Sequence, residues 1–458
     1  MTARTERPKV LTKAFGPAVI CLLALFPCAA AMAGGTNGIL FEADDTSGRI
    51  ATYRPTGRDG NNPFFQQLGS NGRTCNTCHR ASDGWSITPA HIHERFAETL
   101  GSDPLFRPID GATCPTDDIS SVTAMRTAYA LLLNRGLIRI PLSLPASAEF
   151  SITDMIDPYG CSQLDSQGSG VISVYRRPLP VTNLVFLTSI TWDGREPDLR
   201  TQALNAALQH ERPKTSPSED QLDQIVGFET ANYTAQVFDR AAGSLRAWGA
   251  TAGPVAVSDQ QFLVGINDPF GGNPTGALFD PDVFVLYEPW LQAPHTALTP
   301  ARQAVIRGER VFNEKLITIS GVAGLNDALG LQRIAGACSF CHDTPGVGNH
   351  STDLPLDTGV SELGTRGLPR FSLSCHSGPL AGASFALTDP GRAAITGQCA
   401  DIGKFKVPTL RGLAARPPYF HDGSANTLMD VVNFYDHRFA IGLTLQQKRD
   451  LVAFLKTL

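Results

Sequence analysis

Two copies of the pattern Cys-x-x-Cys-His constrain this chain of 458 residues most strongly. They are "CNTCH" at 75–79 and "CSFCH" at 338–342. Two thiols at this spacing reach both vinyl groups of a haem, and the following histidine can meet the iron. Structural zinc or vicinal disulfides are the alternatives, but neither explains a histidine directly after both pairs. We therefore predict two covalently bound haem c groups. The residues concerned are Cys75, Cys78, His79, Cys338, Cys341 and His342.

The first 33 residues have the features of a secretory signal peptide. Basic residues precede the apolar run "AVICLLALFPCAAA", and "AMA" stands before Gly34. This run is too short and too interrupted by proline to span a membrane stably, and no other stretch is long and apolar enough. We therefore expect cleavage near Ala33 and a periplasmic protein with no membrane span.

Charge and cysteine usage agree with export. The formal net charge is −5, and loss of the more basic leader would make the chain more acidic, which argues against a nucleic-acid partner. Four cysteines lie outside the leader and the two motifs, and an even remainder in an oxidising compartment predicts two disulfides. Because each pair lies within one expected domain, we favour Cys114 with Cys161 and Cys375 with Cys399.

The two motifs lie about 260 residues apart, which is too far for one small cytochrome. We expect a mainly α fold of two tandem class I cytochrome c-like domains with long loops, and with the haems facing the interdomain interface. The expected units are 34–215, a helix and loop-rich connection at 216–298, and 299–458. Ser218 with Gln221 and Thr444 with Gln447 have capping-box spacing, which predicts two helix starts.

Tyr435 lies in "LMDVVNFYDHRF" at 428–439. Leu428, Val431, Val432 and Tyr435 follow the i, i+3, i+4, i+7 spacing of one apolar helix face. The tyrosine is therefore directed inward, either as a core residue or as an iron ligand.

Two longer stretches resemble the bacterial dihaem cytochrome c peroxidase family, to which MauG also belongs. They are "GKFKVPTLRGLAARPPYFHDGSANTLMDVVNFY" near the C-terminus and "TWDGREPDLRTQA" at 191–203. The resemblance implies an oxidoreductase that uses hydrogen peroxide at the His79 haem. Its electrons would come from a small cytochrome c, a cupredoxin or aromatic residues of a protein substrate.

The resemblance also assigns roles to single residues. Ordinary family members have a methionine ligand fourteen residues after the histidine of "YFHDG", and counting from His421 gives Tyr435, as in MauG-like members. Trp192 matches the tryptophan between the haems, and Gln202 matches the distal glutamine.

The resemblance also implies an acid–base group beside the His79 haem. Glu211 or its neighbour His210 could have this role, and we favour Glu211, although its alignment needs a one-residue gap. His91 or His93 could instead close the sixth position of that iron.

A calcium ion is a further implication of the resemblance, held by the side chain of Asn183 and the carbonyls of Arg416 and Pro418. Two other functions stay open from the sequence. One is a dihaem electron-transfer cytochrome without catalysis, and the other is a dihaem oxygenase.

Overall fold

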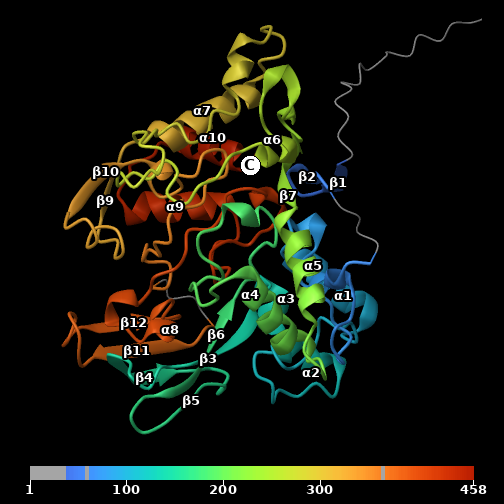
Figure 1. Cartoon of the computed structure of the whole chain (residues 1–458), viewed down its shortest axis with the longest axis vertical. Coiled ribbons are helices and arrows are strands. Elements are labelled where there is room, and N and C mark those ends of the chain that lie inside the picture. Colours follow the sequence, from blue (N-terminus) through green and yellow to red (C-terminus); the bar gives the residue numbers. More distant parts are fainter. Residues whose placement is uncertain (1–37, 57–60, 363–366) are drawn as a thin grey trace, which may run out of the picture. The chain divides into compact units, whose positions relative to one another are not determined.

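The computed structural model describes residues 38–56, 61–362 and 367–458, and Figure 1 shows its helices and strands. The predicted leader and its cleavage site near Ala33 lie outside these ranges. Among the described residues, no helix is both long and apolar enough to cross a membrane.

Short antiparallel strands form four sheets within the described ranges. The first has the order β1 (Ile39–Asp44), β2 (Gly48–Arg54), β7 (Tyr233–Asp239) and β8 (Gly243–Ser244). The second pairs β10 (Arg333–Gly336) with β9 (Ile317–Ser320). The third has the order β12 (Ser384–Leu387), β11 (Arg370–Cys375) and β4 (Phe150–Ile156), and the fourth the order β3 (Ile138–Ser143), β6 (Gly170–Arg176) and β5 (Gln163–Leu164).

These sheets show that the predicted mainly α fold of tandem class I cytochrome c-like domains is wrong, because the fold is mixed helix and strand. The segment 138–176 contains β3, β4, β5 and β6, where we expected no strands. β6 has the sequence GVISVYR and is buried from Ile172 to Arg176. Its β-branched residues fit a pleated sheet, and its continuous burial hides the period-2 alternation that marks a half-exposed strand.

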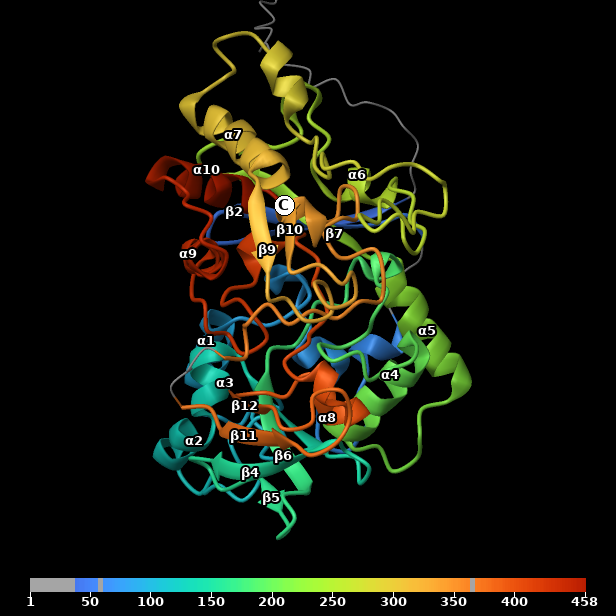
Figure 2. The same ribbon diagram turned by 90° about the vertical axis from the view of Figure 1, so that its left-hand side faces the viewer.

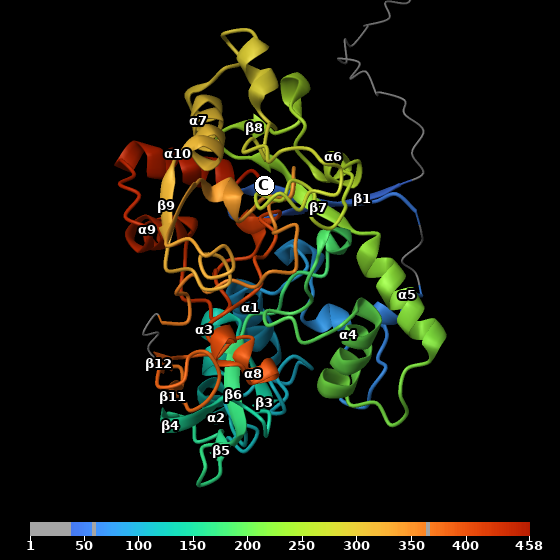
Figure 3. The same ribbon diagram turned by 60° about the vertical axis from the view of Figure 1, so that its left-hand side comes forward.

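The third sheet joins segments that are far apart in the chain. β4 pairs with β11, with Ile152 opposite Leu373 and Phe150 opposite Cys375, and the two strands lie side by side in Figures 1 and 3. The predicted division assigned these strands to different domains, at 34–215 and 299–458. The boundaries themselves stay a prediction.

Ten α-helices are assigned within the described ranges: α1 (Pro89–Thr99), α2 (Val122–Ala128), α3 (Ala130–Arg135), α4 (Leu199–Ala206), α5 (Glu219–Thr230), α6 (Pro254–Ser258), α7 (Pro300–Glu314), α8 (Ala393–Thr396), α9 (Leu428–Arg438) and α10 (Leu445–Leu455). The two predicted capping boxes are confirmed. Ser218 and Gln221 cap α5, and Thr444 and Gln447 cap α10. In both helices the cap residue accepts from the third backbone amide, which satisfies one of the free donors at the helix start.

α7 and α10 pack against each other (Figure 2), and α7 also contacts the turn of the second Cys-x-x-Cys-His motif. Gly308 lies in the contact, where an added Cβ would stand 2.0 Å from the carbonyl oxygen of Asp450. The missing side chain therefore allows the two backbones to approach. Phe312 from α7 and Phe454 from α10 belong to the same apolar core.

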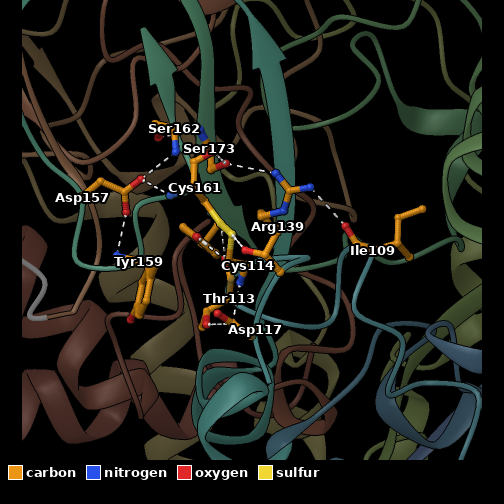
Figure 4. Close-up of a disulfide and its surroundings, with 12 residues drawn as sticks. Ile109, Thr113, Cys114, Asp117, Arg139, Asp157, Tyr159, Cys161, Ser162 and Ser173 are labelled. Atoms are coloured by element: carbon orange, nitrogen blue, oxygen red, sulfur yellow. Dashed lines mark hydrogen bonds between the residues drawn. A yellow bond between two sulfur atoms is a disulfide. The ribbon is translucent and has the colours of Figure 1, made fainter. Parts of the chain in front are cut away.

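Both predicted disulfides are confirmed: Cys114 bonds to Cys161, and Cys375 bonds to Cys399. Figure 4 shows the first one among loop hydrogen bonds. The amide of Cys114 donates to Asp117 at 2.7 Å, and the amide of Cys161 donates to Asp157 at 2.9 Å. Both ends of the bridge are thus held by local carboxylates.

Candidate functional site

The two Cys-x-x-Cys-His motifs have the same local structure. Short 3-10 turns cover Cys75–Thr77 and Cys338–Phe340. In each motif the amide of the histidine donates to the carbonyl of the first cysteine, at 3.1 Å for His79 and 3.2 Å for His342. The turn therefore brings the histidine back toward that cysteine. All four motif cysteines have free thiols.

Each motif histidine leaves Nε2 available to a metal. Nδ1 of His79 donates to the carbonyl of Trp85 at 3.0 Å, and Nδ1 of His342 donates to the carbonyl of Gly348 at 2.6 Å. Burial lowers the pKa of both histidines to about 4, so the rings are neutral at pH 7. With the proton on Nδ1, the lone pair lies on Nε2, which is the arrangement of a histidine iron ligand.

A mostly apolar cavity of about 220 Å³ surrounds the second motif. Cys338, Cys341 and His342 line it together with Tyr435. The predicted inward direction of Tyr435 on α9 is thus confirmed, because Val432 on the same face is buried and both residues line this cavity. Burial raises the pKa of the Tyr435 phenol to about 12, and its hydroxyl is hydrogen-bonded to Thr358. Its role as an iron ligand stays a prediction.

A second cavity, of about 460 Å³, contains His79. Three of the residues assigned by resemblance line it with His79, namely Trp192, Gln202 and His210. Gln202 comes from α4, and His210 comes from the π-helical turn Ala207–Glu211 that continues α4.

Glu211, the favoured acid–base residue, does not line this cavity. Its Oε2 accepts from the amide of Leu68 at 3.0 Å, and its Oε1 lies 3.6 Å from Sγ of Cys75. The π turn explains this orientation, because a widened turn changes which neighbouring side chain faces inward. It ends at Arg212, which has a left-handed φ of 56°. The gap needed to align Glu211 lies at the same place in the chain.

His210 instead has the environment of an acid–base residue. Its Nδ1 donates to Oδ2 of Asp110 at 2.5 Å, and Oδ1 of Asp110 accepts from Arg73 at 2.6 Å. Burial alone would raise the pKa of Asp110, but the hydrogen bond from His210 and the charge of Arg73 lower it. Asp110 is therefore ionised and fixes the imidazole ring, which leaves Nε2 for proton exchange.

Sequence reasoning missed Asp110 and Arg73. Asp110 lies 100 residues before His210, and Arg73 lies 37 residues before Asp110. Because the three meet only in the folded chain, no local motif could have indicated them.

Trp192 lines both cavities. Its indole Nε1 donates to the carbonyl of Arg177 at 2.8 Å. Its ring lies edge-to-face with His421, with 6.3 Å between the centroids. The indole thus stands in the wall common to the two motif cavities.

Buried cations are a further feature of these walls. Lys406 lines both cavities, and Arg416 lines the one at His342. Burial lowers the pKa of Lys406 to about 7 and that of Arg416 to about 10, and Nε of Arg416 has no hydrogen-bond partner. Haem is an apolar ring that carries two carboxylates, and buried cations can pair with these carboxylates. The free thiols, the neutral histidines and the apolar walls match its covalent attachment, its iron and its ring.

Two of the predicted calcium ligands are hydrogen-bonded within the protein, and the calcium site stays a prediction. The side-chain oxygen of Asn183 accepts from the amide of Thr234 at 3.0 Å, and its nitrogen donates to the Thr234 carbonyl at 2.9 Å. The carbonyl of Arg416 accepts from Arg177 at 3.3 Å. Pro418 lines the His342 cavity.

His91 and His93 do not line the cavity with His79. Nδ1 of His91 is hydrogen-bonded to Asp83, and His93 is exposed on α1. A role of either as the sixth ligand stays a prediction.

Comparison with known proteins finds similarity to peroxidases and to MauG, although no family model matches the chain. A cytochrome-c peroxidase of Denitromonas iodatirespirans is 34% identical over 134 residues, which is 27% of this chain and 36% of that protein. The cytochrome c551 peroxidase of Nitrosomonas europaea is 39% identical over 156 residues, or 29% of this chain and 46% of that protein. The methylamine utilization protein MauG of Methylorubrum extorquens is 24% identical over 308 residues, or 64% of this chain and 66% of that protein.

These relatives confirm the resemblance predicted from the sequence. The chain spans between 36% and 66% of their lengths.

Proposed function

We propose that this protein is a hydrogen peroxide-dependent dihaem c oxidoreductase of the cytochrome c peroxidase and MauG type. The observation that carries the proposal is the position of Trp192 in a wall common to two cavities, one with His79 and one with His342. Haem bound at the two motifs would supply the iron redox chemistry, and Tyr435 would be an iron ligand at the His342 motif. The named relatives support a peroxidase-like enzyme.

His210 is the proposed acid–base residue for peroxide. Reduction of one H₂O₂ consumes two electrons and two protons and yields two water molecules. His210 Nε2 takes the proton from one peroxide oxygen and returns it to the other, so that the second oxygen leaves as water. Asp110 stabilises the protonated imidazole, and the amide of Gln202 donates to or accepts from the bound peroxide. Glu211 is not retained in this role because it is turned toward Leu68 and Cys75.

Trp192 is the proposed path for electrons between the two haems, since its indole is the aromatic group that both cavities share. The electrons originate from a small cytochrome c, a cupredoxin or aromatic residues of a protein substrate. We also propose that the protein is exported to the periplasm and that residues 1–33 are removed.

A stoichiometric peroxide titration of the diferric holo-protein tests this function. Visible and near-infrared absorption is followed after each equivalent. We expect one equivalent of peroxide to change the absorption of both haems, because two oxidising equivalents are shared through Trp192. In Trp192→Phe, the spectral change at the second haem should be slower. Trp248→Phe is the matched control, since Trp248 is half-exposed and lines neither cavity.

Other outcomes separate the competing functions. A protein inert to peroxide in both the diferric and the one-electron-reduced state would be an electron-transfer cytochrome. Consumption of O₂ without any response to peroxide would indicate an oxygenase.

A further inference from the structure

The guanidinium of Arg177, which directly follows β6, is surrounded by main-chain carbonyls. Nη1 donates to the carbonyl of Arg135 at 2.9 Å, and Nη2 donates to the carbonyl of Ile87 at 2.7 Å and to that of Arg416 at 3.3 Å. These three oxygens come from segments separated by 42, 90 and 239 residues from Arg177. One buried cation therefore ties three distant parts of the chain together.

The charge of Arg177 has no ion-pair partner among the described residues. Its side chain is buried, and desolvation lowers its pKa to about 9, with nearby Arg416 lowering it further. Asp83 lies close enough to favour the charge, but it accepts from Thr88 and His91. A positive charge enclosed by neutral oxygens is the pattern of a hard-cation site, where carbonyl dipoles replace the lost water.

The main chain of Arg177 connects the same position to the wall between the cavities. Its amide donates to the carbonyl of His421 at 2.7 Å. Its carbonyl accepts from the indole Nε1 of Trp192 at 2.8 Å. A residue fixed at both its guanidinium and its peptide groups therefore sets the position of the Trp192 ring.

The carbonyl of Arg416 connects the Arg177 guanidinium with the predicted calcium site. The resemblance had assigned this oxygen to a calcium ion together with Asn183, but Arg177 donates to it and the Asn183 amide is used by Thr234. We propose that the guanidinium of Arg177 is the structural cation at this junction, that it takes the place of a metal ion there, and that it is a positioning residue for Trp192. The protein then needs no calcium.

The first test is metal content and chelation of the holo-protein. Elemental mass spectrometry should find far less than one calcium per chain. EGTA, and calcium added afterwards, should leave the melting temperature and the haem absorption spectrum unchanged. Stoichiometric calcium whose removal lowers the melting temperature would overturn the proposal. This test is independent of peroxide reactivity.

The second test replaces the cation. Arg177→Gln removes the charge and the guanidinium donors of three carbonyls, of which the bond to Ile87 is buried, so the melting temperature should fall by about 5 °C or more. Arg177→Lys keeps the charge with fewer donors and should recover part of that loss. Arg411→Gln is the matched control, because Arg411 is equally buried and donates to a carbonyl, that of Gly346, but has no bond to Trp192.

A readout specific to Trp192 distinguishes positioning from general stability. It is the rate of electron equilibration between the haems in the one-electron-reduced protein, and it rests on the proposed pair of haems. We expect Arg177→Gln to slow this rate as Trp192→Phe does, whereas Arg411→Gln leaves it near the wild-type value. Equal rates in Arg177→Gln and the wild type would refute the positioning role, even if the peroxide reaction itself is confirmed.

Discussion

His210 and Glu211 are neighbours in the sequence but have different surroundings. The side chain of His210 is 35% exposed and faces the cavity that contains His79. Glu211 is 3% exposed and is held by the amide of Leu68. Desolvation raises the pKa of Glu211, but a carboxyl group that does not reach the cavity cannot exchange a proton with a substrate there. Access therefore favours the histidine.

The pair gives a direct test of the acid–base assignment. His210→Gln should slow the reaction of the diferric protein with peroxide by about 100-fold or more, because general acid–base catalysis contributes about that much. Asp110→Asn should cause a smaller loss, since the ring remains but is less well oriented. Glu211→Gln is the control and should stay within a few-fold of the wild type. Stopped-flow absorption measures all four proteins, and a larger loss in Glu211→Gln than in His210→Gln would reverse the assignment.

At the scale of single residues, the sequence predicted the direction of side chains on regular elements better than of those in irregular turns. Tyr435 follows a helical period, so its inward direction was predictable and is confirmed. Glu211 is the last residue of a π turn, which shifts the register and which no sequence pattern indicated. Asp110 could not be predicted as the partner of His210, because its contact depends on tertiary structure alone.

Two helical glycines show how packing between elements decides the effect of the same substitution. Gly308 on α7 faces the backbone of α10, whereas Gly227 on α5 is exposed and has no heavy atom within 4 Å of an added Cβ. Gly308→Ala should lower the free energy of unfolding by about 3 kcal/mol, because two backbones must separate. Gly227→Ala should raise it by about 0.5–1 kcal/mol, because alanine favours the helix. Thermal or denaturant unfolding measures both, and a tolerated Gly308→Ala would contradict the close approach of α7 and α10.

Helices were easier to predict than strands for a physical reason. The starts of α5 and α10 carry capping boxes, whose side-chain and backbone groups lie three residues apart and are visible in the sequence. The third and fourth sheets have no such local signal. β4 needs β11, more than 200 residues away, to form its ladder. Long-range pairing therefore created the strands that made the predicted mainly α fold wrong.

At the scale of the whole molecule, the disulfides and the buried acids affect the free energy of unfolding. The two disulfides were predictable because each joins cysteines close in sequence, 47 and 24 residues apart. The buried acids were not predictable, since burial arises from packing. Desolvation raises the pKa of Glu229 on α5 and of Glu309 on α7 to about 8, and Oε2 of Glu229 has no hydrogen-bond partner.

The raised pKa values of Glu229 and Glu309 predict that the free energy of unfolding falls as the pH rises. In the unfolded chain a glutamate has a pKa of about 4.3. Between about pH 4.3 and pH 8 the folded protein therefore holds more protons on Glu229 and Glu309 than the unfolded chain does. The stability associated with the protonated acids is fully present below the lower value and is lost as the pH approaches 8. For each residue the loss is on the order of a few kcal/mol.

Glu229→Gln should remove one of the two contributions. We expect the wild-type melting temperature to fall between pH 5 and pH 8.5, and the variant to lose a clearly smaller part of its stability over that range, because an amide does not titrate. Glu219→Gln is the matched control, since Glu219 begins the same helix and is exposed, and its pH dependence should follow the wild type. Differential scanning calorimetry across this range makes the comparison. If Glu229→Gln and the wild type show the same slope, Glu229 does not hold its proton in the folded protein, and the assignment of this pH dependence to Glu229 is wrong.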